Sequence, residues 1–203
     1  GADLILVDHP GKNSMPLIDS LSDRWNVQIS YYTCNLEQQE QRLELFDKIK
    51  NKHKKLNVLV NNAALVGSSD LKGWASNFED QKVEIWRRAL EVNLTAPFHL
   101  SQSLAPLMKK SQGANIINVG SIYGEYAPDW QLYKDTNMAS PAAYGASKGG
   151  LKQLTRWLAT TLAPDIRVNT ISPGGVFRNQ PEIFVKRYER RTPLGRMAKE
   201  EDI

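Results

Sequence analysis

The feature that most constrains the fold is a regular alternation of short apolar segments with longer segments of helical periodicity. The apolar segments show little polar alternation, which is typical of parallel β-strands covered on both faces. A turn signal, Pro10-Gly11, ends the first of them. The predicted strands are Ala2–Val7, Val27–Tyr32, Leu56–Val60, Asn115–Val119 and Ile166–Ile171.

The segments between these strands repeat apolar residues every three or four positions, as amphipathic helices do. Strands and helices that alternate at this spacing predict the α/β class, with a Rossmann-like, doubly wound parallel sheet and helices on both faces. No repeat and no linker rich in Gly and Pro divides the chain, so we expect one domain over residues 1–203. The predicted helices are Ser14–Trp25, Gln38–Asn51, Val83–Lys110 with a break near Pro97, and Pro141–Leu162.

The composition argues against several other classes of protein. No apolar run approaches the roughly 18 residues of a membrane span, and the first residues do not read as a secretory signal. The single cysteine, Cys34, excludes an internal disulfide, and the three scattered histidines predict no metal site. We therefore expect a cytoplasmic protein with no membrane partner.

The net charge of +4 reflects 26 Lys and Arg residues against 22 Asp and Glu residues. The basic runs Lys48–Lys55 and Lys186–Arg191 alternate with acidic and apolar residues, as solvated helix faces do. We expect no nucleic-acid partner from this pattern, which equally suits a mild attraction for an anionic ligand such as a nucleotide.

The topology predicts where a ligand would bind. In doubly wound sheets, ligands lie beyond the carboxyl ends of the strands. The candidate residues are therefore those that follow each predicted strand: Asp8, Asn35, Asn62, Ser121 and Pro173-Gly174.

The sharpest local motif is Tyr144-Gly-Ala-Ser-Lys148, which places a phenol and an ammonium group on one helix face. A free tyrosine has a pKa near 10, so about one molecule in a thousand is phenolate at neutral pH. A fixed cation in a cleft could supply the roughly 4 kcal/mol that brings such a group to neutrality. The motif thus predicts a proton donor to an alcohol or carbonyl oxygen. Its alternative is a surface Tyr/Lys pair with no role.

Two further polar residues stand at positions that predict a partner. Ser121 follows the strand Asn115–Val119, so its hydroxyl should lie at the same sheet edge, either facing a substrate or capping a turn. Asn93 lies inside an otherwise apolar helix, where asparagine is unfavourable unless its amide is bonded.

Together these residues resemble the short-chain dehydrogenase/reductase family over nearly the whole chain. The resemblance implies a dinucleotide-dependent oxidoreductase that interconverts an alcohol and a ketone. Part of it, from Ser121 to Pro141, is also similar to members from flagellin-modification and nonulosonic-sugar pathways. The segments that carry the family resemblance, in order, are Asn61–Ala64, Asn93, Ser121, Tyr144 with Lys148, Pro173-Gly174, Arg191–Arg196 and Glu200–Ile203.

The resemblance implies a role for each matching position. Tyr144 would be the general acid/base, and Lys148 would stabilise its phenolate and hold the nicotinamide ribose. Ser121 would position the substrate oxygen, and Asn93 would hold a water in a proton relay. Residues implied to line the cofactor, besides Tyr144 and Lys148, are Asn35, Leu36, Asn62, Pro173, Gly174 and Val176.

Asp8 bears on the choice of cofactor. It ends the first predicted strand, where a carboxylate can accept hydrogen bonds from both ribose hydroxyls of an adenosine. A 2′-phosphate would meet charge repulsion there, so NAD is favoured over NADP. His9 and Lys12 lie close enough in sequence to soften that repulsion, and a plain loop aspartate is the alternative.

One departure from the family is an absence. The sequence contains no Thr-Gly-x-x-x-Gly-x-Gly turn, which cradles the pyrophosphate in the family. We expect the family's first strand, which would lie between Ala2–Val7 and Leu56–Val60, and its last strand to be missing from these 203 residues. We therefore expect the chain to be part of a longer protein.

The other departures concern the substrate side. Ser121 and Tyr144 are 23 positions apart, more than the family's usual spacing, and the extra segment is Glu125–Pro141. It is either a surface insertion or an aromatic wall of a pocket suited to a sugar or nucleotide sugar. Arg178 stands where the family usually has a threonine, and it could meet an anionic substrate group.

The expected function is therefore an NAD(P)-dependent oxidoreductase acting on a small, sugar-like substrate. A 3-oxoacyl reductase, a generic alcohol dehydrogenase and a non-catalytic dinucleotide-binding protein are the alternatives. The resemblance also implies a homodimer or homotetramer that associates through the helices Val83–Lys110 and Pro141–Leu162.

Overall fold

The computed structural model describes residues 2–66 and 71–203. Its strands begin and end within two residues of the predicted bounds, and every strand pair is parallel. This pairing confirms the α/β fold with a doubly wound parallel arrangement. The strands are β1 (Leu4–Asp8), β2 (Ile29–Thr33), β3 (Val58–Asn61), β4 (Ala114–Val119) and β5 (Ile166–Ile171).

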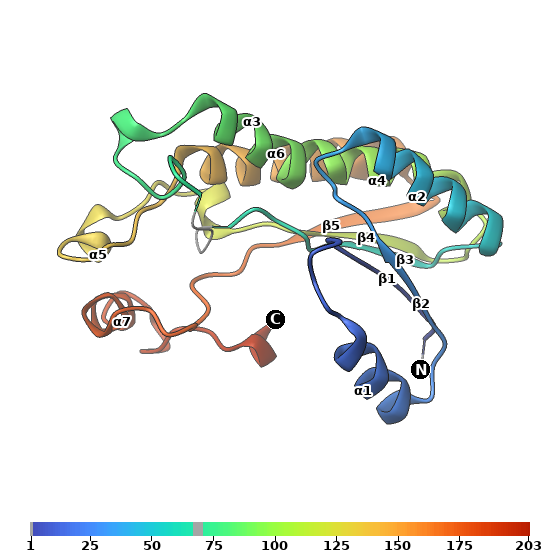
Figure 1. Cartoon of the computed structure of the whole chain (residues 1–203), viewed down its shortest axis with the longest axis horizontal. Helices are drawn as coiled ribbons and strands as arrows, with labels where there is room; N and C mark the ends of the chain where they lie inside the picture. Colours follow the sequence, from blue (N-terminus) through green and yellow to red (C-terminus); the bar gives the residue numbers. More distant parts are fainter. Residues whose placement is uncertain (1, 67–70) are drawn as a thin grey trace.

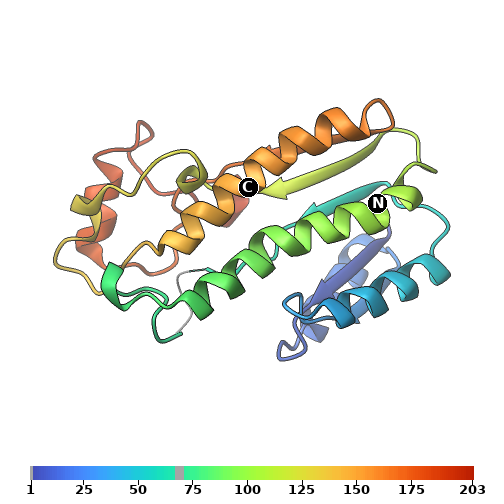
Figure 2. The same cartoon turned by 90° about the horizontal axis from the view of Figure 1, so that it is seen from above.

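Most helices lie in one layer above the strands. In Figure 1 the helices α2, α3, α4 and α6 cover one side, whereas α1 lies on the other side. Figure 2 shows α6 beside α3 and α4, and α2 beside α4. The helices are α1 (Met15–Trp25), α2 (Gln39–Lys52), α3 (Val83–Leu90), α4 (Ala96–Met108), α5 (Trp130–Tyr133), α6 (Ala142–Leu162) and α7 (Glu182–Glu189).

The strands form two hydrogen-bonded sheets, one with the order β1-β2 and one with the order β3-β4-β5. Between them, the facing edges of β1 and β3 have no strand partner among the described residues. This is the place where the sequence predicts a missing strand, because a parallel sheet of this topology has one strand between those two edges.

The core lies between the strands and the upper helix layer. Ile116 of β4 and Ile166 of β5 are fully buried, and they pack against Met108 of α4 and Leu158 of α6. A second cluster joins α2 to α4, where Phe46 is fully buried. Burial of these apolar side chains fixes the layer on which the polar residues of the site stand.

The opposite face of β3, β4 and β5 is more open in the part of the chain that the structure describes. Val58 and Val60 of β3 are 48% and 52% exposed, and Ile171 of β5 is 39% exposed. The apolar character of the strands predicts cover on both faces, but α1 packs without burying any residue completely. No helix among the described residues is both long and apolar enough to cross a bilayer.

The predicted break in the long helix is a π-helical turn, η2 (Glu91–Thr95), between α3 and α4. Pro97 follows it and has no backbone N–H to donate to the carbonyl of Asn93, four residues earlier. A π-turn with a buried polar residue in its middle is typical of functional positions. Asn93, the buried polar residue in the middle of this turn, is therefore a candidate functional residue.

Candidate active site

Ser121 lies where β4 ends, as predicted, and it is buried. It begins the short helical turn η3 (Ile122–Gly124), and its Oγ accepts a hydrogen bond of 3.2 Å from the backbone N–H of Tyr123. Ser121 is therefore a turn cap as well as a candidate for substrate contact. Because the hydroxyl accepts in this bond, its own proton remains available for donation to a ligand oxygen.

Lys148 reaches the same strand end from α6. Its side chain is 3% exposed, and Nζ donates a 2.6 Å hydrogen bond to the carbonyl of Val119, two residues before Ser121. Burial lowers the pKa of Lys148 to about 8. At pH 7 about nine-tenths of the molecules therefore still carry the charge.

Tyr144 lies one turn before Lys148 on α6, and the Lys148 Nζ is 5.8 Å from the centroid of its ring. The ring is partly buried against a cluster that contains Trp74 and Ala89. Among the described residues no hydrogen bond joins the Tyr144 hydroxyl to Ser121 or Lys148. The structure thus brings an ammonium group next to the phenol ring.

The turn that carries Ser121 rests directly on α6. A side chain at Gly124 would come within 2.8 Å of the backbone carbon and oxygen of Lys148, so only glycine allows this approach. The close contact of η3 with α6 holds Ser121 on the same side of the molecule as Tyr144 and Lys148.

Asn93 is buried and uses its whole amide within the protein. Its Oδ1 accepts a 2.7 Å bond from the backbone N–H of Leu65, and its Nδ2 donates to the Leu65 carbonyl at 3.2 Å and to Ser147 Oγ at 3.0 Å. The expected polar partner is therefore the segment after β3, together with α6. A relay water, if Asn93 holds one, has to bond to the backbone carbonyl of Asn93 or to the second lone pair of its side-chain Oδ1.

The candidate residues for the adenosine end of a dinucleotide stand after β1, β2 and β3. Asp8 Oδ2 accepts from Ser14 Oγ at 2.7 Å, and Oδ1 accepts from the His9 N–H at 2.7 Å. Asn35 Oδ1 caps a tight turn by accepting from the Glu37 N–H at 3.0 Å. Leu36 packs partly buried in the α2–α4 cluster, and Asn62 is exposed beyond β3.

Pro173 and Gly174 follow β5 as expected, and Val176 pairs with Ala198 in an isolated parallel bridge. Arg178, offered as a contact for an anionic substrate, is exposed and forms a 3.0 Å ion pair with Glu200.

A buried arginine escaped the sequence analysis. Arg42 of α2 is 1% exposed; its guanidinium donates to the Leu36 carbonyl, to His99 Nδ1 at 3.2 Å and to Glu91 Oε1 at 2.6 Å. Burial lowers the pKa of His99, and the adjacent charge of Arg42 lowers it further. Arg42 therefore connects the loop beside Leu36 to the π-turn that holds Asn93.

The extra segment Glu125–Pro141 contains the helix α5 and borders a cavity of about 770 Å³. Three exposed aromatic side chains line it: Phe78, Tyr126 and Trp130. Its inner wall includes Tyr123, two residues after Ser121, and Gly145, next to Tyr144. The insertion forms most of the cavity wall, and Tyr123 and Gly145, which are close in the chain to Ser121 and Tyr144, line it, whereas Ser121, Tyr144 and Lys148 do not.

A comparison with protein-family models shows which family the chain belongs to. The family model for short chain dehydrogenase matches residues 1–180, and the chain belongs to that family.

Two relatives indicate how the chain compares with whole proteins. It is 33% identical over 159 residues to post-translational flagellin modification protein A of Campylobacter coli, covering 77% of this chain and 60% of the relative. It is 32% identical over 177 residues to 3-oxoacyl-[acyl-carrier-protein] reductase FabG of Thermotoga maritima, covering 85% and 65%. The chain thus spans less than two thirds of either relative.

Solved structures share the fold. A short chain dehydrogenase from Leptospira borgpetersenii with bound NAD+ is 29% identical, with a TM-score of 0.79 over 99% of this chain and 82% of that one. The RhlG/NADP active-site complex from Pseudomonas aeruginosa is 26% identical, with a TM-score of 0.81 over 100% of this chain and 76% of that one. These relatives bind NAD+ in one case and NADP in the other.

Proposed function

We propose that the protein is an NAD(P)-dependent oxidoreductase that interconverts an alcohol and a ketone. The observation that carries the proposal is the convergence of Ser121, Tyr144 and Lys148 at the carboxyl end of β4. Lys148 Nζ is held 2.6 Å from the Val119 carbonyl and 5.8 Å from the Tyr144 ring centroid. A protein that only binds a dinucleotide has no need for this set.

Each residue has a part in moving one proton. A nicotinamide cofactor, when bound, supplies or accepts the hydride. Ser121 donates a hydrogen bond to the substrate oxygen and fixes its position. Tyr144 passes its phenolic proton to that oxygen in reduction and takes it back in oxidation. The Lys148 ammonium stabilises the phenolate that results.

The residues present fit part of a dinucleotide. The Asp8 carboxylate stands at the end of β1 with lone pairs left for ribose hydroxyls, which supports NAD over NADP. Asn35, Leu36 and Asn62 follow neighbouring strands, and Gly174 and Val176 follow β5. For the pyrophosphate, the described residues offer no glycine-rich turn at a helix start. The residues that fit the cofactor therefore lie at its adenosine end and at its nicotinamide end, and not at the pyrophosphate between them.

We further propose a sugar or nucleotide sugar as the substrate. The cavity beside the site carries three exposed aromatic faces and the polar side chains of Gln131 and Lys134, a combination that suits a hydroxylated ring. The similarity to a flagellin modification protein supports this class. The similarity to a 3-oxoacyl reductase favours an acyl ketone as the second candidate.

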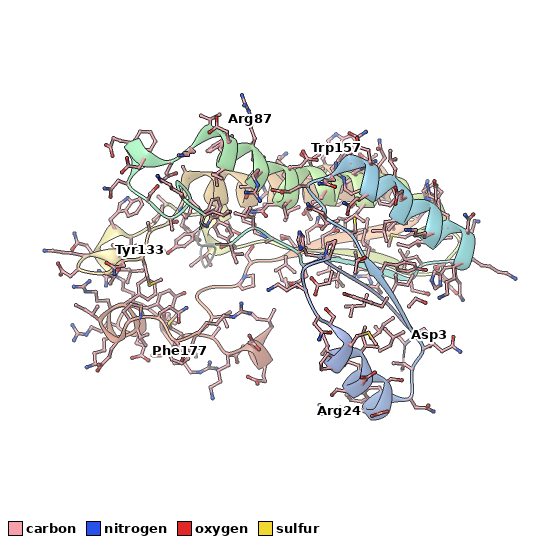
Figure 3. The ribbon with its side chains drawn as sticks, in the orientation of Figure 1. Asp3, Arg24, Arg87, Tyr133, Trp157 and Phe177 are labelled. Atoms are coloured by element: carbon pink, nitrogen blue, oxygen red, sulfur yellow. The ribbon has the colours of Figure 1, made fainter. Side chains whose placement is uncertain are left out.

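The proposal includes a homodimer or homotetramer in the cytoplasm. Trp86 of α3, Phe98 of α4 and Trp157 of α6 expose apolar surface on the outer helix layer, which suits an interface between copies. Trp157 lies on the outer side of α6 in Figure 3. The free, buried Cys34 suits a reducing compartment.

Substitution of Tyr144 by phenylalanine tests the enzymatic role. We expect Tyr144→Phe to lower hydride transfer by about 10²- to 10⁴-fold, because the variant has no proton to exchange with the substrate oxygen. Binding of NADH, measured by fluorescence, should stay within about twofold. Turnover should be measured in the full-length protein with NADH and NADPH against sugars, nucleotide sugars and acyl ketones. Equal turnover in the variant would contradict the proposal.

A further inference from the structure

The insertion is anchored to α7 as well as to the site. Leu132 and Tyr133 of α5 are buried together with Phe184 of α7 and Met197. The rings of Tyr133 and Phe184 meet edge to face at 5.4 Å between centroids. Figure 3 shows Tyr133 between α5 and the segment that carries α7. A helix of only four residues is therefore fixed by tertiary packing rather than by its own length.

Charged pairs hold the two ends of this contact. Asp129, before α5, forms a 2.6 Å ion pair with Arg191, just beyond α7. Asp135, after α5, forms a 3.3 Å pair with Arg187, whose guanidinium also donates to the Lys134 carbonyl. Each exposed pair contributes little stability, but two pairs on opposite ends define one orientation.

The same cluster reaches Ser121 on one side. The hydroxyls of Tyr123 and Tyr133 are 2.5 Å apart in a hydrogen bond, and the Tyr123 backbone N–H donates to Ser121 Oγ. Burial raises the pKa of both tyrosines, so the pair stays neutral at physiological pH. The insertion is thereby bonded to the turn that carries Ser121.

On the other side the cluster reaches the segment implied to line the cofactor. Phe184 stacks on Tyr188 of α7 at 6.1 Å between centroids, and the Tyr188 hydroxyl accepts a 2.6 Å bond from the Gly175 N–H. A side chain at Gly175 would meet the Tyr188 ring at 3.0 Å, so there is no room for one between Gly175 and Tyr188. Tyr188 therefore fixes the residues that directly follow Gly174.

We propose that Tyr133 is a positioning residue that joins the Ser121 turn to α7 and, through Tyr188, to Gly175. The inference rests on the proposed oxidoreductase function. The insertion then holds the wall of the substrate cavity and the end of the cofactor site in one arrangement before any ligand binds. Neither the family resemblance nor the motif Tyr144–Lys148 requires this contact, because the insertion itself is a departure from the family's spacing.

The test is Tyr133→Phe in the full-length protein, which removes one hydroxyl and keeps the ring. Amide hydrogen exchange of η3 should become about tenfold faster, the factor for losing one hydrogen bond between buried groups, because the lost hydroxyl bonds to Tyr123, while α7, which keeps the ring contact, and α2 stay unchanged. The substrate KM should rise about tenfold with kcat within twofold. Tyr31→Phe is the matched control, since it removes a buried hydroxyl that has no hydrogen-bond partner within residues 2–66 and 71–203.

A second variant, Asp129→Asn with Asp135→Asn, should speed exchange in α7 roughly twofold without touching the tyrosine pair. Unchanged η3 exchange in Tyr133→Phe overturns the inference, and so does faster exchange with an unchanged KM. The exchange measurement needs no substrate. If the wild type has no turnover, the proposed function fails, while faster η3 exchange in the variant still supports the contact.

Discussion

At Lys148, burial and charge oppose each other. The side chain is almost wholly removed from solvent, and its hydrogen-bond acceptor among the described residues is the uncharged carbonyl of Val119. Among the described residues no carboxylate pairs with this ammonium group, and burial lowers the pKa of Lys148 to about 8. The residue therefore combines a function with a cost to stability.

This cost predicts a pH dependence of stability. Below pH 8 both the folded and the unfolded chain hold the Lys148 proton; between about 8 and 10.5 only the unfolded chain holds it. The unfolded state then binds more protons, so the free energy of unfolding rises with pH in that window. Relative to Lys148→Met, the wild type should gain about 2 kcal/mol from pH 8 to 9.5, measured by urea unfolding. Parallel pH curves for the two proteins would contradict this.

Other residues differ in how far the sequence predicts them. The need of Asn93 for a polar partner follows from its place in an apolar helix, although its partner, Leu65, does not. Arg42 reads as part of a charged helix face, yet it is buried, because its acceptors at Leu36, Glu91 and His99 converge only in the folded chain. Side-chain burial that depends on distant acceptors leaves no local pattern.

At the scale of elements, the site depends on how closely η3 approaches α6. The contact brings the backbone of Gly124 against that of Lys148, and a side chain at Gly124 has no room there. The helices and strands themselves follow from periodicity and are predicted to within a few residues. The helix α5 is not, because four residues have no period of their own and depend on packing with α7.

Substitution of Gly124 by alanine should separate these elements. Its Cβ would lie 2.8 Å from the Lys148 carbonyl, so we expect the free energy of unfolding to fall by about 1–3 kcal/mol. Gly149→Ala is the matched control, since its Cβ meets the Gly124 oxygen at an ordinary 3.4 Å and alanine favours the helix. Thermal and urea unfolding would compare the two. A Gly124→Ala protein as stable as Gly149→Ala would show that η3 is not held by this contact.

At the scale of the molecule, two apolar surfaces lie on opposite sides of the strands. One is the outer helix layer with Trp157, and the other is the open face of β3 with Val58 and Val60. The sequence predicts the unpaired edges of β1 and β3, since the expected topology has a strand between them. It does not predict how far the sheet face beneath is exposed, because apolar strands look the same whether or not they are covered.

We expect substitutions on the two surfaces to affect association between copies of the protein differently. If copies associate through the helices, Trp157→Glu should convert the oligomer to a monomer, because it places a charge in an apolar contact. Val60→Glu, on the opposite face, should leave the oligomer intact and reduce aggregation of the 203-residue chain. Sedimentation velocity distinguishes these results. Dissociation by Val60→Glu alone would place the interface on the sheet face.

The double anchoring of the insertion has a consequence for how its chemistry can change. The exposed residues Tyr126 and Trp130 line the cavity, and Tyr123 and Tyr133, which also line it, carry the hydrogen bond to the Ser121 turn. Exchange of Tyr126 or Trp130 therefore leaves that bond in place. A scaffold built this way lets mutation change which ligands the cavity accepts without moving the turn to which the insertion is bonded.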